Sequence, residues 1–136
     1  MDAAVRHLVR ERAENRCEYC RLPQDGCDLT FHIEHIVASQ HQQNDDPSNL
    51  ALACNKCNLH KGTNLATIDE ETGERVDLFN PRTDLWDDHF QFIGAEIIGL
   101  TPTGRAMARL LHMNSDRRLI LRRRLISEGT MSDEPS

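Results

Sequence analysis

The fold of this chain is decided by two short stretches, Cys17-Glu-Tyr-Cys20 and Cys54-Asn-Lys-Cys57. In each stretch two residues separate the cysteines, and 33 residues separate one pair from the other. A turn of this kind lets two thiolates converge on one ion, and two such turns complete the tetrahedral four-sulfur shell that zinc accepts. The sequence therefore predicts a structural Zn²⁺ site formed by Cys17, Cys20, Cys54 and Cys57.

Two other uses of the cysteine pairs stay open at this point. A disulfide framework needs an oxidising compartment, whereas residues 1–16 alternate charged and apolar side chains and lack the apolar core of a signal peptide. A redox Cys-x-x-Cys motif would not explain why the chain carries two copies. We therefore expect a cytoplasmic protein with a zinc site, in which the fifth cysteine, Cys27, is an inert, partly buried thiol.

The length and composition predict one compact domain. The chain has 136 residues, of which 38% are apolar and 28% are charged. No apolar run approaches the ~18 residues of a membrane helix, so we expect no membrane association. We predict an α+β fold in which residues 1–66 form the core with an N-terminal helix. Residues 67–128 form an extension packed on the same domain, and residues 129–136 form a frayed tail.

The order of the elements follows from periodicity and turn signals. Val5, Leu8, Val9 and Ala13 recur with helical spacing after a possible cap at Asp2. Residues 29–37 have the composition of a strand, and residues 55–61 that of a short helix closed by Gly62. Residues 66–88 are acidic and turn-rich. Residues 88–93 and 95–100 predict a hairpin around Gly94, followed by helices over 103–112 and 116–126.

Polar side chains with the chemistry of an active site lie between and within the cysteine pairs. They are His32, Glu34, His35, Asn49, Asn58 and His60. Taken singly, each has an ordinary explanation, such as a surface histidine or a turn asparagine. Their order along the chain is the informative feature: Cys-x2-Cys, then Glu34-His35, then Asn49-Leu50, then Cys-x2-Cys-Asn58-x2-Lys61.

This order resembles the HNH endonuclease family, in the branch that carries zinc knuckles. The resemblance covers residues 17–62 and implies a ββα-metal fold with strands at 30–36 and 50–54 and a helix at 55–61. It implies that His35 is the general base that activates a water molecule. It also implies that Asn49 holds the intervening loop and orients His35.

The same resemblance implies a catalytic divalent ion bound by Glu34 and Asn58, with His60 as a further candidate ligand. Glu34 stands where relatives more often have Asp or His. Carboxylate and amide oxygens suit Mg²⁺ or Mn²⁺, whereas the thiolates suit Zn²⁺. Lys61 is a candidate phosphate contact, and His32 and His41 could contact a ligand or simply face solvent.

The charge distribution bears on what the protein binds. The net charge is −6, with −7 in residues 63–100 and +3 in residues 101–136. The C-terminal arginines favour two interpretations equally: contact with a DNA backbone, or a solvated helix face paired with the acidic segment. We expect duplex DNA bound with weak sequence specificity by a monomer or a homodimer.

The sequence thus predicts a metal-dependent endonuclease that hydrolyses DNA phosphodiester bonds. The alternatives are a zinc-stapled module that binds nucleic acid or a protein without cutting, and a purely structural zinc domain. His35, Asn49 and Asn58 favour the nuclease, because a passive zinc domain does not need them.

Overall fold

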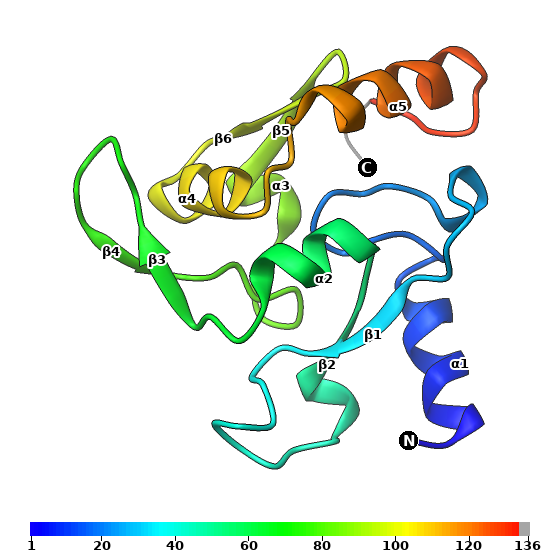
Figure 1. The fold of residues 1–136 in the computed structure, drawn as a ribbon, viewed down its shortest axis with the longest axis vertical. Helices are drawn as coiled ribbons and strands as arrows, with labels where there is room; N and C mark the ends of the chain where they lie inside the picture. Colours follow the sequence, from blue (N-terminus) through cyan, green and yellow to red (C-terminus); the bar gives the residue numbers. More distant parts are fainter. Residues whose placement is uncertain (134–136) are drawn as a thin grey trace.

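The centre of the molecule is a hairpin followed by a short helix. A computed structural model describes residues 1–133. Strand β1 (His32–His35) pairs antiparallel with β2 (Leu50–Ala53), with Glu34 opposite Ala51, and the chain passes directly from β2 into helix α2 (Asn55–Lys61). Figure 1 shows α2 lying over this hairpin. This is the ββα order that the sequence predicts.

Helix α1 (Ala3–Arg12) lies beside the hairpin and contacts β2. The Asp2 side chain accepts a hydrogen bond from the backbone N–H of Val5 (2.9 Å), which confirms the predicted cap. The side chains of Arg12 donate to the carbonyl oxygens of Pro47 and Leu50 and tie the helix to the start of β2. Every residue of β2 is buried, so this strand carries no polar alternation.

The C-terminal extension consists of two hairpins and three helices (Figure 1). Strands β3 (Ala66–Ile68) and β4 (Arg75–Asp77) form one hairpin, and β5 (Phe90–Ile93) and β6 (Glu96–Gly99) form the other. Helix α3 (Trp86–His89) precedes β5, and α4 (Pro102–Leu110) and α5 (Asp116–Ser127) follow β6. A Cβ on Gly104 would lie 2.0 Å from the carbonyl oxygen of His89, so glycine permits the close packing of α4.

The α+β prediction is confirmed, and so are the hairpin around Gly94 and the two C-terminal helices. Residues 66–88, which the sequence describes only as acidic and turn-rich, contain β3, β4 and the start of α3. The strands β3 and β4 are three residues each, and none of these residues is buried. Strands this short are too brief to show hydrophobic alternation.

One cluster of buried apolar side chains includes residues of the ββα unit and of the extension. The indole N–H of Trp86 donates to the carbonyl oxygen of Tyr19 (2.8 Å) across this junction. Within residues 1–133, no helix combines the length and apolarity that crossing a bilayer requires.

The first part of the predicted tail packs on the protein. Gly129 has a φ of +76°, which turns the chain back, and the N–H groups of Thr130 and Met131 both donate to the carbonyl oxygen of Leu125. Met131 is 8% exposed. Residues 134–136 of the predicted tail lie outside the described residues.

Candidate metal centre and active site

The four cysteines of the two pairs form one buried cluster. Their sulfur atoms all lie within 4.8 Å of one another. The Sγ atoms of Cys20 and Cys54 are 3.7 Å apart, and all five cysteines of the chain are free thiols. A disulfide would bring the two sulfur atoms to ~2.0 Å, whereas a Zn–S bond of ~2.3 Å in a tetrahedron separates neighbouring sulfur atoms by ~3.8 Å. The cluster therefore has the dimensions of a zinc site.

The protonation of the cluster also fits a cation. Burial raises the pKa of Cys17 and of Cys57 well above the usual range, while hydrogen bonds from Cys17 lower the pKa of Cys20 and of Cys54. Four neighbouring thiols can all ionise together only if positive charge is brought among them. A Zn²⁺ ion held by the four sulfur atoms would supply that charge and would link the two cysteine pairs.

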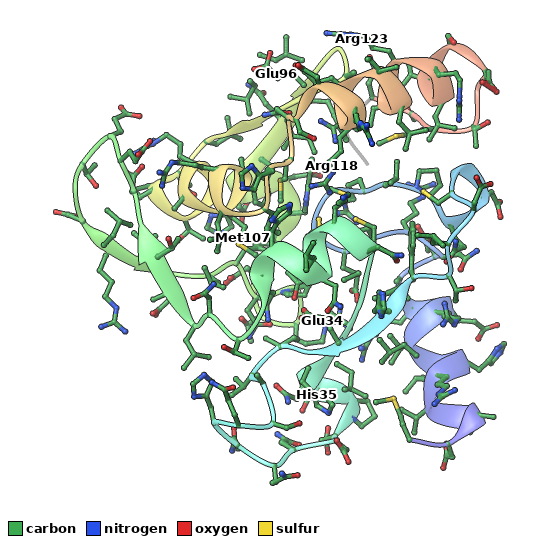
Figure 2. All side chains as sticks on the ribbon, viewed as in Figure 1. Glu34, His35, Glu96, Met107, Arg118 and Arg123 are labelled. Atoms are coloured by element: carbon green, nitrogen blue, oxygen red, sulfur yellow. The ribbon has the colours of Figure 1, made fainter. Side chains whose placement is uncertain are left out.

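Arg118 supplies further positive charge from α5. Its guanidinium donates to the Sγ of Cys57 (2.9 Å) and of Cys54 (3.4 Å), and also to the carbonyl oxygens of Leu111 and His112. Burial alone would lower the pKa of Arg118, but the neighbouring cysteine sulfurs raise it instead. Figure 2 shows Arg118 between α5 and α2, the helix that carries Cys57.

The other C-terminal arginines divide into buried, paired and free groups. Arg122 is 1% exposed and donates to the carbonyl oxygen of Ala95 and the side chain of Asn114. Arg105 pairs with Asp69 and Glu71, and Arg109 pairs with Glu70. The interpretation that these side chains pair with the acidic segment is therefore confirmed for Arg105 and Arg109. Within residues 1–133, only Arg117 and Arg123 of the C-terminal group are exposed without an ion pair.

His35 lies at the end of β1 and pairs with an acidic residue of the following loop. Its Nε2 is 2.7 Å from Oδ1 of Asp45, and 24% of the His35 side chain is exposed. The partner carboxylate fixes the orientation of the ring. If Nε2 carries the proton that Asp45 accepts, the lone pair of Nδ1 is left to accept another proton.

Asn49 closes the loop that carries Asp45. Its Oδ1 accepts from the N–H of Val37 (2.9 Å), and its Nδ2 donates to the carbonyl oxygens of Val37 (3.1 Å) and Asn44 (2.9 Å). The side chain thus joins the residue two positions after His35 to the residue before Asp45. Because it is 94% buried, Asn49 makes these bonds away from competing water.

Glu34 lies between β1 and α2 (Figure 2) and is held by two groups of the protein. Its Oε2 is 3.1 Å from Nζ of Lys61, and its Oε1 accepts a hydrogen bond from the hydroxyl of Tyr19. Burial raises the pKa of Glu34, and the charge of Lys61 opposes this effect. The carboxylate therefore already faces a positive charge, the ammonium of Lys61.

The sequence suggested that Lys61 contacts a phosphate. In the structure its side chain is buried and faces groups of the protein rather than solvent. It is 1% exposed, and its Nζ also donates to the carbonyl oxygens of Ile36 (3.0 Å) and His35 (3.4 Å). An ammonium buried in this way is satisfied by acceptors of the protein.

The two candidate ligands of α2 lie on different sides of the helix. Asn58 precedes Lys61 by three residues and so shares the face of α2 that covers β1. His60 is two residues from Asn58, about 200° around the helix, and its ring lies against that of His112, with centroids 4.3 Å apart and planes tilted by 42°. Partial burial, followed by the charges of His112, Arg118 and Lys56, lowers the pKa of His60. Asn58 thus shares the helix face of Lys61, whereas His60 lies on the other side of the helix beside His112.

The remaining candidates have simpler surroundings. His32 is exposed, and His41 contacts the carbonyl oxygen of Thr63 at the surface. Cys27 is half-buried, and burial raises the pKa of its thiol to about 11, as expected for an unreactive cysteine.

Sequence reasoning missed three residues of the site. Tyr19, Asp45 and Arg118 each contact a side chain that the motif includes. Tyr19 lies between Cys17 and Cys20, and this position inside the first cysteine pair could have identified it as a residue of the site. The two others come from a polar loop and from a run of arginines, where neighbouring residues look equivalent.

A hairpin and helix closed by a four-cysteine cluster define a small ββα protein of the zinc-knuckle class. The sequence profile of the HNH endonuclease family matches residues 17–64 of this chain.

Septu protein PtuB from Bacillus thuringiensis is 26% identical to this chain over 129 residues. The similarity covers 93% of this chain and 48% of PtuB, so the chain spans about half the length of that relative. An alignment of this length includes much of the C-terminal extension as well as the HNH domain. No solved structure gives a significant match.

Proposed function

We propose that this chain is a metal-dependent endonuclease that hydrolyses phosphodiester bonds of DNA with His35 as its general base. The observation that carries the proposal is the partly exposed His35, whose ring lies 2.7 Å from Asp45 in a loop that Asn49 closes. A structural zinc protein gains nothing from a histidine ordered in this way. The likeness to the HNH family supports the same assignment.

His35 acts as the general base. Its imidazole accepts a proton from a water molecule, and the resulting hydroxide attacks the phosphorus in line with the leaving oxygen. Asp45 accepts a hydrogen bond from the other ring nitrogen and stabilises the imidazolium that forms. Asn49 keeps the strand end and the loop at a fixed separation, so that the ring and the carboxylate stay paired.

Glu34 and Asn58 are the proposed ligands of the divalent ion. Two oxygen donors leave room for water and for a phosphate oxygen, which suits Mg²⁺ or Mn²⁺. Lys61 and the Tyr19 hydroxyl hold the two oxygens of Glu34, so an ion bound there would have to replace one of these partners. When bound, such an ion neutralises charge on the phosphate and on the leaving oxygen.

Cleavage of supercoiled plasmid tests the proposal. Zinc-loaded protein, freed of other metals, is incubated with plasmid, and Mg²⁺ or Mn²⁺ is added back. We expect nicked product with the wild type and a rate lower by about 10²–10⁴-fold with His35→Ala, the usual loss of a general base. His7→Ala is the matched control, because His7 is a surface residue of α1 paired only with Glu11.

The competing function is a zinc-stapled module that binds nucleic acid or a protein without cutting it. Retarded migration of DNA without cleavage under either metal, unchanged by His35→Ala, would favour this module over the nuclease. Only Arg117 and Arg123 of the C-terminal arginines in residues 1–133 are free for phosphates, so we expect modest, salt-sensitive affinity and weak sequence specificity.

A further inference from the structure

Lys61 is a buried cation that the proposed mechanism does not use. It is 1% exposed, and the three donors of its ammonium have three acceptors: Oε2 of Glu34 (3.1 Å) and the carbonyl oxygens of Ile36 (3.0 Å) and His35 (3.4 Å). Separating the ammonium from these partners would leave an uncompensated charge in the protein interior. Lys61 is therefore a fixed point beside the end of β1.

The two carbonyl oxygens belong to consecutive peptide groups that directly follow His35. The first peptide group joins His35 to Ile36, and the second joins Ile36 to Val37. In a regular strand, successive carbonyl groups point to opposite sides. Here β1 ends at His35 and the chain bends at Ile36 and Val37, so both oxygens reach the same ammonium.

Asn49 holds the same two peptide groups at their nitrogen atoms. Its backbone oxygen accepts from the N–H of Ile36 (2.8 Å), and its Oδ1 accepts from the N–H of Val37 (2.9 Å). The N–H and C=O of a trans peptide point in opposite directions, so Lys61 and Asn49 hold each peptide group from opposite sides. Rotation of either peptide group would break its bonds to both residues.

We propose that Lys61 is a positioning residue for His35, and that it forms with Asn49 a two-sided clamp on the peptide groups between residues 35 and 37. The Cα atom of His35 is part of the first of these peptide groups. The clamp therefore fixes the point from which the imidazole extends and keeps the ring within reach of Asp45, 2.7 Å away. This inference rests on the proposed role of His35 as general base and makes no use of an ion at Glu34.

Nuclear magnetic resonance of the histidine rings tests the clamp without any need for cleavage. Zinc-loaded full-length protein is labelled with ¹⁵N, and the ring signals of His35 are identified by their loss in His35→Gln. The wild type should show two well-separated nitrogen signals, because pairing with Asp45 leaves one ring nitrogen protonated and the other bare. In Lys61→Met the ring should lose this fixed pairing, and the two signals should converge. Lys56→Met is the matched control, because Lys56 is exposed on the same helix.

A double variant separates positioning from stability. Lys61→Met alone leaves the Glu34 carboxylate buried without a compensating charge, so its melting temperature should fall. Glu34→Gln/Lys61→Met has no charge at either position, and its melting temperature should return toward that of the wild type. The ring signals of His35 should nevertheless stay converged in the double variant, because a methionine side chain donates no hydrogen bond to the two carbonyl oxygens.

Plasmid cleavage provides a second readout. We expect kcat of Lys61→Met to fall by about 10–100-fold, the loss that follows when a group of the reaction is held less precisely. KM should change little, because Lys61 acts on the base rather than on DNA.

Wild-type ring signals of His35 in Lys61→Met or in the double variant overturn the inference. Failure of both variants to fold also overturns it, because Lys61 would then support the whole fold rather than the position of one residue. The nuclease proposal fails on a different result, namely plasmid cleavage that does not depend on His35, and the ring signals would still report on the clamp. The two failures are therefore distinguishable.

Discussion

The guanidinium of Arg118, on helix α5, lies 2.9 Å from the sulfur of Cys57, although 61 positions of sequence separate the two residues. A site of four thiolates and one Zn²⁺ carries a net charge of −2, and a buried charge of this size needs nearby compensation. Arg118 and the buried Arg122 bring two positive charges to that region, and the Cys20, Cys57 and Cys54 sulfurs raise the pKa of Arg118. The C-terminal helix therefore belongs to the metal centre as well as to the extension.

Replacing Arg118 by Met should weaken zinc binding. The variant loses both N–H···S bonds and one compensating charge, a change of about 3 kcal/mol for a buried charged partner. We expect faster zinc release to a competing chelator and a lower melting temperature. Arg117→Met is the control, because Arg117 is the exposed neighbour on the same helix. Equal zinc release from the two variants would show that Arg118 does not compensate the thiolates.

Replacing Cys17 by Ser should abolish the fold rather than the chemistry alone. A structural zinc site contributes roughly 10 kcal/mol to folding in small domains, and the hydroxyl of Ser is a poor zinc ligand. We expect loss of bound zinc by elemental analysis and loss of the cooperative melting transition. Cys27→Ser should keep both, because Cys27 lies outside the cluster. A Cys17→Ser protein with full zinc content and unchanged melting would contradict the four-cysteine assignment.

The sequence predicted the elements that local patterns determine. The two cysteine pairs, the α2 helix ending before Gly62 and the hairpin around Gly94 each combine a spacing rule with a turn residue. The β2 strand is a different case, since burial of all four residues removes the alternation that identifies a strand. Its assignment came from the resemblance to the HNH family.

The missed features depend on contacts between distant segments. The sequence predicted that Lys61 contacts phosphate and that Arg118 either contacts DNA or faces solvent. Both side chains are instead buried, because cysteine sulfurs, a carboxylate and backbone carbonyls contact them in three dimensions. No local pattern distinguishes Arg118 from exposed Arg117. The β3–β4 hairpin was missed for another reason, since three-residue strands have too few residues to show a period.

Replacing Asn49 by Ala should loosen the loop between β1 and β2. The three hydrogen bonds to Val37 and Asn44 are lost, and two backbone carbonyls and one N–H lose their partner. We expect a decrease of about 1–3 kcal/mol in the free energy of unfolding, measured by denaturant titration, together with slower plasmid cleavage. Gln43→Ala, an exposed change in the same loop, should leave both unchanged. Stability equal to that of the control would show that Asn49 does not hold the loop.

Replacing Asp45 by Asn tests whether this residue orients the proposed base. The amide keeps the shape of the side chain but removes the charge that stabilises an imidazolium at His35, whose Nε2 lies 2.7 Å away. A partner of this type changes activity by about 10–100-fold in comparable histidine sites. We expect kcat to fall by about tenfold with little change in KM, because Asp45 contacts the base rather than the DNA. The melting temperature should change little, since the Asp45 side chain is 76% exposed.

Asp25→Asn, an exposed change on the turn after the first cysteine pair, controls for the loss of one negative charge. A rise in KM with kcat preserved, or equal kinetics in the two variants, would mean that Asp45 acts on DNA binding or not at all, and His35 would then need another orienting group.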